Sequence, residues 1–282
     1  MTTELQLERG TVSASSSTAR SIVALGWKEA RRIVLSPVYG VVIIFMLAMG
    51  GLRSVVDGFS FSVPSAAVVY DIVTFLGLLY GGLLTYLAAH LVATSSRRTH
   101  ADNQLAASAL SSRSRGGALC LGVLFGPGLI AAILMVMLAW IGSDVVLPDD
   151  QQASSLAELA QIALTVIGAG LFAVMVATWL RFPGSLLIGL SALMVGTTLL
   201  IDPARGPDNT LPWLAPYSTA SNWSDEAWTS MGSQSWHAVY LAGLCGLAAC
   251  AVMMRRRESR GRWMLVSAAV LTMTAAAGWI QL

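Results

Sequence analysis

Long apolar stretches alternate with short polar segments along the whole chain. There are seven such stretches, and each is close to the roughly 20 residues that a helix needs to cross a hydrocarbon core. The pattern therefore predicts an all-α, polytopic membrane protein with about seven transmembrane helices. The apolar stretches cover residues 33–54, 66–93, 117–141, 158–180, 184–201, 236–254 and 263–282.

The positive charges predict how the chain is oriented. Of its 17 lysines and arginines, all but Arg53 and Arg205 fall on one side of the apolar stretches. Short loops rich in Lys and Arg stay in the cytoplasm, so we expect a cytoplasmic N-terminus, an outer C-terminus and a multi-pass position in the cell membrane. The cytoplasmic cations are Arg9, Arg20, Lys28, Arg31, Arg32, Arg97, Arg98, Arg113, Arg115, Arg181, Arg255, Arg256, Arg257, Arg260 and Arg262.

Composition and motifs exclude several functions. Charged residues make up 11% of the chain, whereas soluble domains have about 25%. Lys28 is the only lysine and precedes the first span, so there is neither a phosphate-binding GxxxxGK[ST] loop nor a Schiff-base lysine in the last span. No HExxH or GxSxG motif occurs. We predict no catalytic, metal-binding or cofactor-binding residues, and hence not an enzyme.

Small residues interrupt or line the predicted spans. The three cysteines, Cys120, Cys245 and Cys250, lie within spans, and we expect them to pack as small apolar groups. The run 125–128 (Phe-Gly-Pro-Gly) should interrupt the third span, because proline removes a helix hydrogen bond. Close helix packing is the expected role of that run and of the glycine pairs Gly81/Gly82 and Gly168/Gly170.

An amphipathic helix is predicted just before the first span, over residues 20–35. Its cations are suited to anionic headgroups at the cytoplasmic interface and its apolar side to lipid. A bend at Ser36-Pro37 leads into the membrane, and residues 1–19 are expected to be a disordered tail. The apolar side carries Val23, Trp27, Ala30 and Val34, and the opposite side carries Lys28, Arg31 and Arg32.

The longest predicted cytoplasmic loop covers residues 94–116, between the second and third spans. Within it, residues 101–110 contain no Gly or Pro and can form a short helix starting near Thr99, with Asp102 in its first turn. Leu105 and Leu110, with arginines on both flanks, offer a surface to a soluble partner. The alternative is an ordinary basic loop.

The outer segment 202–235 is rich in proline and tryptophan. Trp and Tyr prefer the membrane interface, so we expect one or two short helices that lie on the outer leaflet or dip into it. An aromatic belt without a gating role is the alternative.

These three features together resemble the permeases of the ABC type-2 exporter family: a Trp27-Lys28-Glu29-Ala30-Arg31-Arg32 helix before span one, a charged helical loop after span two, and an aromatic outer segment before span six. The resemblance covers residues 20–254. Residues 255–282, a basic loop and a seventh span, exceed the family's six spans. In that family the N-terminal helix and the first cytoplasmic loop bind a separate ATPase, and the outer segment forms gate helices.

The resemblance assigns roles to individual residues. Arg98 stands where the family usually has an acidic residue, and Ala109 where it usually has proline. The residues implied in ATPase coupling are Trp27, Glu29, Arg31, Arg32, Arg97, Arg98, Asp102, Leu105 and Leu110. The outer gate candidates are Trp213, Tyr217, Trp223 and Trp228.

The expected function is that of a permease subunit in an ATP-driven exporter of drugs or other amphipathic or lipid-like molecules. It would pair with a second permease copy or a paralogue and with a cytoplasmic ABC ATPase, which supplies ATP and Mg²⁺; no nucleic acid is involved. Asp71, an intramembrane acid, and Tyr80 and Tyr86 are candidates for the substrate path. Pairing with Arg53 for Asp71, and helix packing for the tyrosines, are the alternatives.

Two other classes stay open. One is a non-transporting immunity or sensor subunit, which predicts partner binding without substrate-stimulated ATP turnover. The other is an ion-coupled secondary transporter, which usually has several ionisable groups near the midplane and repeated halves; neither is evident in the chain.

Overall fold

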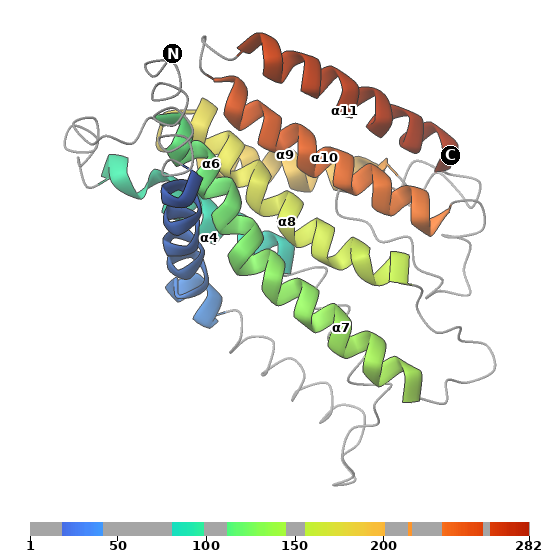
Figure 1. Cartoon of the computed structure of the whole chain (residues 1–282). Helices are drawn as coiled ribbons and strands as arrows, with labels where there is room; N and C mark the ends of the chain where they lie inside the picture. The colour runs from blue at the N-terminus through green and yellow to red at the C-terminus, as the bar shows by residue number, and fades with distance from the viewer. Residues whose placement is uncertain are drawn as a thin grey trace, which may run out of the picture.

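The computed structural model describes residues 19–41, 81–98, 112–144, 156–200, 214–215, 233–255 and 260–281. These residues form helices and short connections, with no strand among them (Figure 1). Residues 19–34 and 37–41 are helical. The further elements are α4 (Gly82–Arg98), α6 (Ser112–Val123), the π-helical turn η2 (Leu124–Gly128), α7 (Leu129–Asp144), α8 (Leu156–Trp179), α9 (Ser185–Leu200), α10 (Gln234–Met254) and α11 (Arg260–Gln281).

The described helices have the length and composition of membrane spans. The hydrocarbon core offers no hydrogen-bond partners to the backbone, and a helix pairs its backbone N–H and C=O groups internally. Two shorter apolar helices, Gly82–Ser95 and Ser185–Thr197, accompany four that are long enough to cross a bilayer. The chain is thus a helical membrane protein, as predicted. The four long helices are Ser114–Met137, Leu159–Trp179, Gln234–Met254 and Arg260–Gln281.

Helix α8 forms the centre of the described bundle and α11 its edge. Within their apolar windows, 67% of α8 but only 17% of α11 is buried. Helix α8 contacts α4, α6, α7, α9 and α10, whereas α11 packs mainly along α10 (Figure 1). Within the described residues, α11 is therefore a peripheral helix that lies beside α10.

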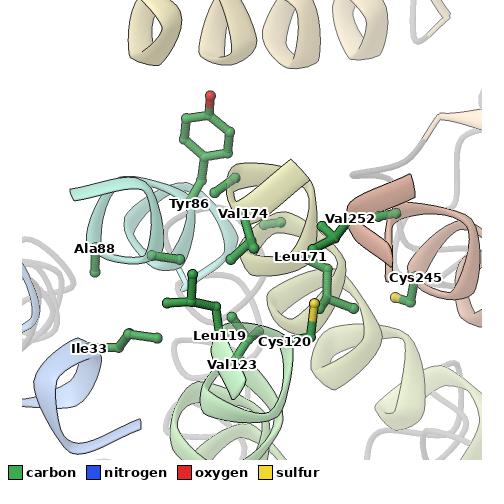
Figure 2. Packing of buried hydrophobic residues seen from close by; sticks show 14 of the residues in the cluster. Ile33, Tyr86, Ala88, Leu119, Cys120, Val123, Leu171, Val174, Cys245 and Val252 are labelled. Carbon is green, nitrogen blue, oxygen red and sulfur yellow. The ribbon is translucent and has the colours of Figure 1, made fainter. Parts of the chain in front are cut away.

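The largest buried cluster joins the N-terminal helix, α4, α6, α8 and α10 (Figure 2). Ile33 from the first helix is fully buried and points toward Val123 and Leu119 of α6. Gly170 of α8 lies where a Cβ would be 2.6 Å from Val123 and 2.9 Å from Thr85. Glycine is needed there because α6 and α4 both contact α8 at this one position. All three cysteines are buried and free, as expected.

The predicted interruption at 125–128 is a single π-helical turn, Leu124–Gly128, and the helix continues through it into α7. Pro127 is buried inside this turn. A proline nitrogen has no hydrogen to donate, and a π turn is a common way to absorb such a residue without ending the helix. The expected packing role of the glycines is confirmed at Gly128, where an added Cβ would be only 2.9 Å from Ile167.

One predicted boundary is wrong. The loop expected over 94–116 is shorter, because α4 continues to Arg98 and α6 begins at Ser112. The hydroxyl of Thr94 donates to the carbonyl of His90 (2.8 Å), and that of Ser95 donates to the carbonyl of Val92 (2.8 Å). Both hydroxyls are thus satisfied within the helix itself, so α4 accommodates these polar residues without another partner for their donors.

The remaining predicted spans match helices closely at both ends. Several other predictions fall on residues that the structure does not describe. The tail before residue 19, the first stretch beyond residue 41 and the second stretch before residue 81 lie outside the described residues. So do the proposed helix 101–110 and the outer segment 202–235, apart from Leu214, Ala215 and residues 233–235.

Candidate functional site

The N-terminal helix, residues 19–34, lies beside α4 and α6 and runs at a steep angle to the bundle helices (Figure 1). A turn at Leu35 and Ser36 follows it, and a short helix begins at Pro37. The amides of Tyr39 and Gly40 donate to the carbonyl of Ser36. Proline suits the first position of a helix, because its missing N–H has no intrahelical acceptor there.

Small residues bring this helix into direct contact with α6 and η2. A Cβ at Gly26 would be 2.8 Å from the Cβ of Leu121, and one at Gly122 would be 3.0 Å from the Cβ of Glu29. At Gly126 it would be 3.1 Å from the carbonyl oxygen of Ala30. Two small-xxx-small pairs, Gly26/Ala30 and Gly122/Gly126, thus face each other, the arrangement that allows membrane helices to pack backbone to backbone.

The predicted environment of Ala30 is wrong. Ala30 was expected on the lipid side, but it is 4% exposed and packs on Gly126. Val23 and Trp27 are 50% and 60% exposed. The ring of Trp27 lies 6.4 Å from that of Phe125 in the π turn. The helix therefore has three sides, because its small residues are buried by protein while an apolar strip and a charged strip stay exposed.

A polar bridge ties the N-terminal helix to the C-terminal end of α4. Both Arg32 and Glu29 belong to that helix, and the Arg32 guanidinium donates to both carboxylate oxygens of Glu29 at 3.0 and 3.1 Å. Its other terminal nitrogen donates to Ser95 Oγ at 2.9 Å. The planar, forked guanidinium makes both contacts at once, which a lysine ammonium does not reproduce. The three side chains join residues 63 apart in sequence.

Helix α4 carries further polar contacts to two neighbouring elements. The hydroxyls of Tyr39 and Thr85 share a hydrogen bond that joins α4 to the short helix 37–41. The Tyr86 hydroxyl donates to the Leu186 carbonyl of α9 at 3.2 Å; in Figure 2 this ring points away from the rest of the apolar cluster. His90 Nε2 and Ser185 Oγ, also between α4 and α9, share a hydrogen bond of 3.1 Å.

These contacts hold the helices together in the interior of the bundle. His90 and Ser185 are each 1% exposed and Tyr86 is fully buried. Helix α4 is thus linked to the N-terminal helix at one end and to α9 along its length.

The sequence-predicted coupling residues are only partly brought together. Trp27 and Arg31 are exposed on the N-terminal helix, while Glu29 and Arg32 form the bridge to α4. Arg97 and Arg98 are the last residues of α4. Tyr86, a substrate-path candidate, is buried at the α4–α9 contact, as its packing alternative requires. The candidates that lie outside the described residues are Asp71, Tyr80, Asp102, Leu105, Leu110, Trp213, Tyr217, Trp223 and Trp228.

The structure describes two residues in the middle of the outer segment, Leu214 and Ala215, and Leu214 contacts α10 and α11. The Tyr240 hydroxyl of α10 donates to the Leu214 carbonyl at 2.9 Å. A Cβ at Gly278 of α11 would be 3.5 Å from both Leu214 and Tyr240. Ala215 is fully buried. The added last helix thus contributes to the surface on which this segment rests.

The sequence did not predict several residues that join the N-terminal helix, α4, α6 and α9. The spacing of Gly26 with Ala30 and of Gly122 with Gly126 is a signal that was present in the sequence. No comparable signal marks Ser95 or Ser185, because a single serine near a helix end is common. Their partners become visible only when distant segments are placed together.

Comparison of the chain with protein-family models, with curated proteins and with solved structures finds no match.

Proposed function

We propose that this chain is the permease subunit of an ATP-driven exporter in the cell membrane. It crosses the membrane seven times with its N-terminus in the cytoplasm, and the helix 19–34 lies in the cytoplasmic interface. It pairs with a second permease copy or a paralogue, and a separate ABC ATPase binds ATP and Mg²⁺. The cargo is an amphipathic or lipid-like molecule, such as a drug.

The observation that carries this proposal is the junction of the N-terminal helix with α4 and α6. In the family that the sequence resembles, the ATPase presses on an N-terminal helix and on the loop after the second span. Here that helix is bonded to the end of α4 through Arg32 and Ser95 and is packed on α6 through Gly122. Helices α4 and α6 flank the loop 99–111 on its two sides. Force on the loop or on the helix therefore reaches the same unit.

The contacts of α4 supply a route into the membrane. Beyond Ser95, the helix bonds to α9 through Tyr86 and His90. Helix α9 precedes the outer segment in the chain, so a displacement of α4 by a partner is carried toward that segment. The two buried histidines of the described spans, His90 and His237, sit at helix contacts, which gives a secondary transporter little support.

The test is to purify the tagged chain from its native host in mild detergent and to identify what accompanies it by mass spectrometry. We expect a near-stoichiometric soluble ATPase, lost when Leu105 and Leu110 are both changed to Asp in a protein that still folds. Phe182→Asp is the control: it places one negative charge on an exposed apolar residue between α8 and α9, and the ATPase should be retained.

Arg32→Gln separates binding from coupling. The variant should keep the ATPase bound while the stimulation of its turnover by substrate falls several-fold, because the bridge from the N-terminal helix to α4 is cut. Bound ATPase that no substrate stimulates in the wild type would favour the immunity or sensor class. Recovery of the chain alone, under conditions that preserve other membrane complexes, would reject the permease assignment.

A further inference from the structure

The exposed surface of the N-terminal helix has an apolar strip beside a cationic strip. Val23 and Trp27 are half or more exposed, and Lys28 and Arg31 are exposed as well. At about 100° per residue, Arg31 stands one turn after Trp27, and Lys28 lies next to Arg31 on the side away from Trp27. The boundary between the two strips runs along the helix, parallel to its axis.

The two cations of this boundary are available to an external anion. The carboxylate that neighbours them, that of Glu29, is occupied by Arg32. The Glu29–Arg32 pair is the only ion pair within the described residues, so neither Lys28 nor Arg31 has a carboxylate partner in that part of the chain. Arg32 is committed to the contact with Ser95. Lys28 and Arg31 therefore form a cationic pair one helical turn apart.

The helix that carries them is held in place, which makes the site preorganised. Gly26 and Ala30 leave no room between the helix and α6 or η2. Trp27 is braced by Phe125, with the two rings inclined by 52°. A binding surface with fixed side-chain origins loses less conformational freedom on binding than a mobile basic tail does.

We propose that Lys28 and Arg31 bind the phosphate of an anionic phospholipid, with an acyl chain lying against Trp27 and Phe125. The chemistry is that of a membrane interface, where cations meet headgroups and indole rings sit at the boundary of the hydrocarbon. A ligand that supplies only negative charge is a poorer fit, since it offers nothing for the exposed apolar strip. The site rests on the interfacial position of the helix proposed above but not on the ATPase.

The test uses the full-length chain alone in mild detergent, with thermal unfolding measured as phosphatidylglycerol or phosphatidylcholine is added. A ligand that binds the folded state raises its unfolding temperature. We expect phosphatidylglycerol to stabilise the wild type more than phosphatidylcholine does. The double change Lys28→Gln/Arg31→Gln should weaken the apparent affinity for phosphatidylglycerol about thirty-fold, which is about 2 kcal/mol at about 1 kcal/mol per cation.

Arg260→Gln/Arg262→Gln is the matched control, because it removes two exposed cations from the start of α11 and leaves the N-terminal helix unchanged. It should keep the phosphatidylglycerol preference. Equal effects of the two lipids on the wild type, or equal loss in both double variants, would overturn the proposal. So would equal stabilisation by soluble glycerol phosphate, which lacks acyl chains. None of these readouts involves the ATPase, so the permease assignment and the lipid site fail separately.

Discussion

At the scale of residues, glycine determines how closely the helices of this protein approach. In hydrocarbon there is no hydrophobic force between helices, so association depends on close packing and on interhelical hydrogen bonds. Gly122 allows the N-terminal helix to sit against α6, and Gly170 allows α8 to sit against α6 and α4. Where a glycine faces open space, as Gly196 does in α9, it contributes no such contact.

Gly122→Leu should therefore destabilise the protein. Its Cβ would stand 3.0 Å from the Cβ of Glu29 and 3.2 Å from the amide of Ala30, and overpacking of this kind typically costs about 1–3 kcal/mol. Thermal unfolding in detergent should show a lower midpoint for this variant. Gly196→Leu makes the same change in a helix with nothing within 4 Å, and it should not lower the midpoint. Equal behaviour of the two variants would contradict the close contact at Gly122.

At the scale of elements, α11 is fastened to the bundle mainly by its second half. Thr274 packs directly on Gly243 of α10, and Gly278 lies against Leu214 and Tyr240. His237 Nδ1 and Gln281 Oε1 form a buried hydrogen bond of 3.2 Å between α10 and α11. In the first half, side chains such as Met264 and Leu265 are exposed, a pattern expected of a helix that faces lipid on most sides.

The His237–Gln281 contact predicts non-additive mutations. Changing only His237 or only Gln281 to Leu removes this hydrogen bond from a buried polar partner, which costs about 1–3 kcal/mol. Changing both removes the two polar groups together and should cost clearly less than the sum of the single changes. Thermal unfolding of the wild type, both single variants and the double variant gives the coupling. A strictly additive cycle would mean that the two side chains do not depend on one another.

At the scale of the whole molecule, the described residues form a bundle around α8 with the N-terminal helix placed across it. The bundle helices run roughly alongside one another, whereas the N-terminal helix runs at a steep angle to them (Figure 1). Its attachment to α4 places Arg32 beside the C-terminal end of that helix, at Ser95. The proposed orientation puts that end in the cytoplasm, in agreement with the positive-inside rule.

Cysteine labelling tests this orientation on the intact molecule. Gly261→Cys at the start of α11 should react with a membrane-impermeant maleimide only after the cells are permeabilised. Ser233→Cys, just before α10, should react in intact cells, because the two positions lie at opposite ends of the α10–α11 pair. The native cysteines are buried, and the parent protein measures their background. Labelling of Gly261→Cys from outside would reverse the proposed orientation.

The sequence alone determined the class of the protein and most helix positions in the described regions. Apolar length and the requirement for internal hydrogen bonds are properties of a segment, so stretches such as 158–180 and 236–254 were located before any contact was known. Only the tertiary structure decided which face of a helix meets protein. Ala30 was assigned to lipid because periodicity reports polarity, and a small apolar residue fits lipid and a glycine surface equally well. Ser95 continues α4, and its bond to Arg32 depends on a segment 63 residues away, so no local pattern contains that information.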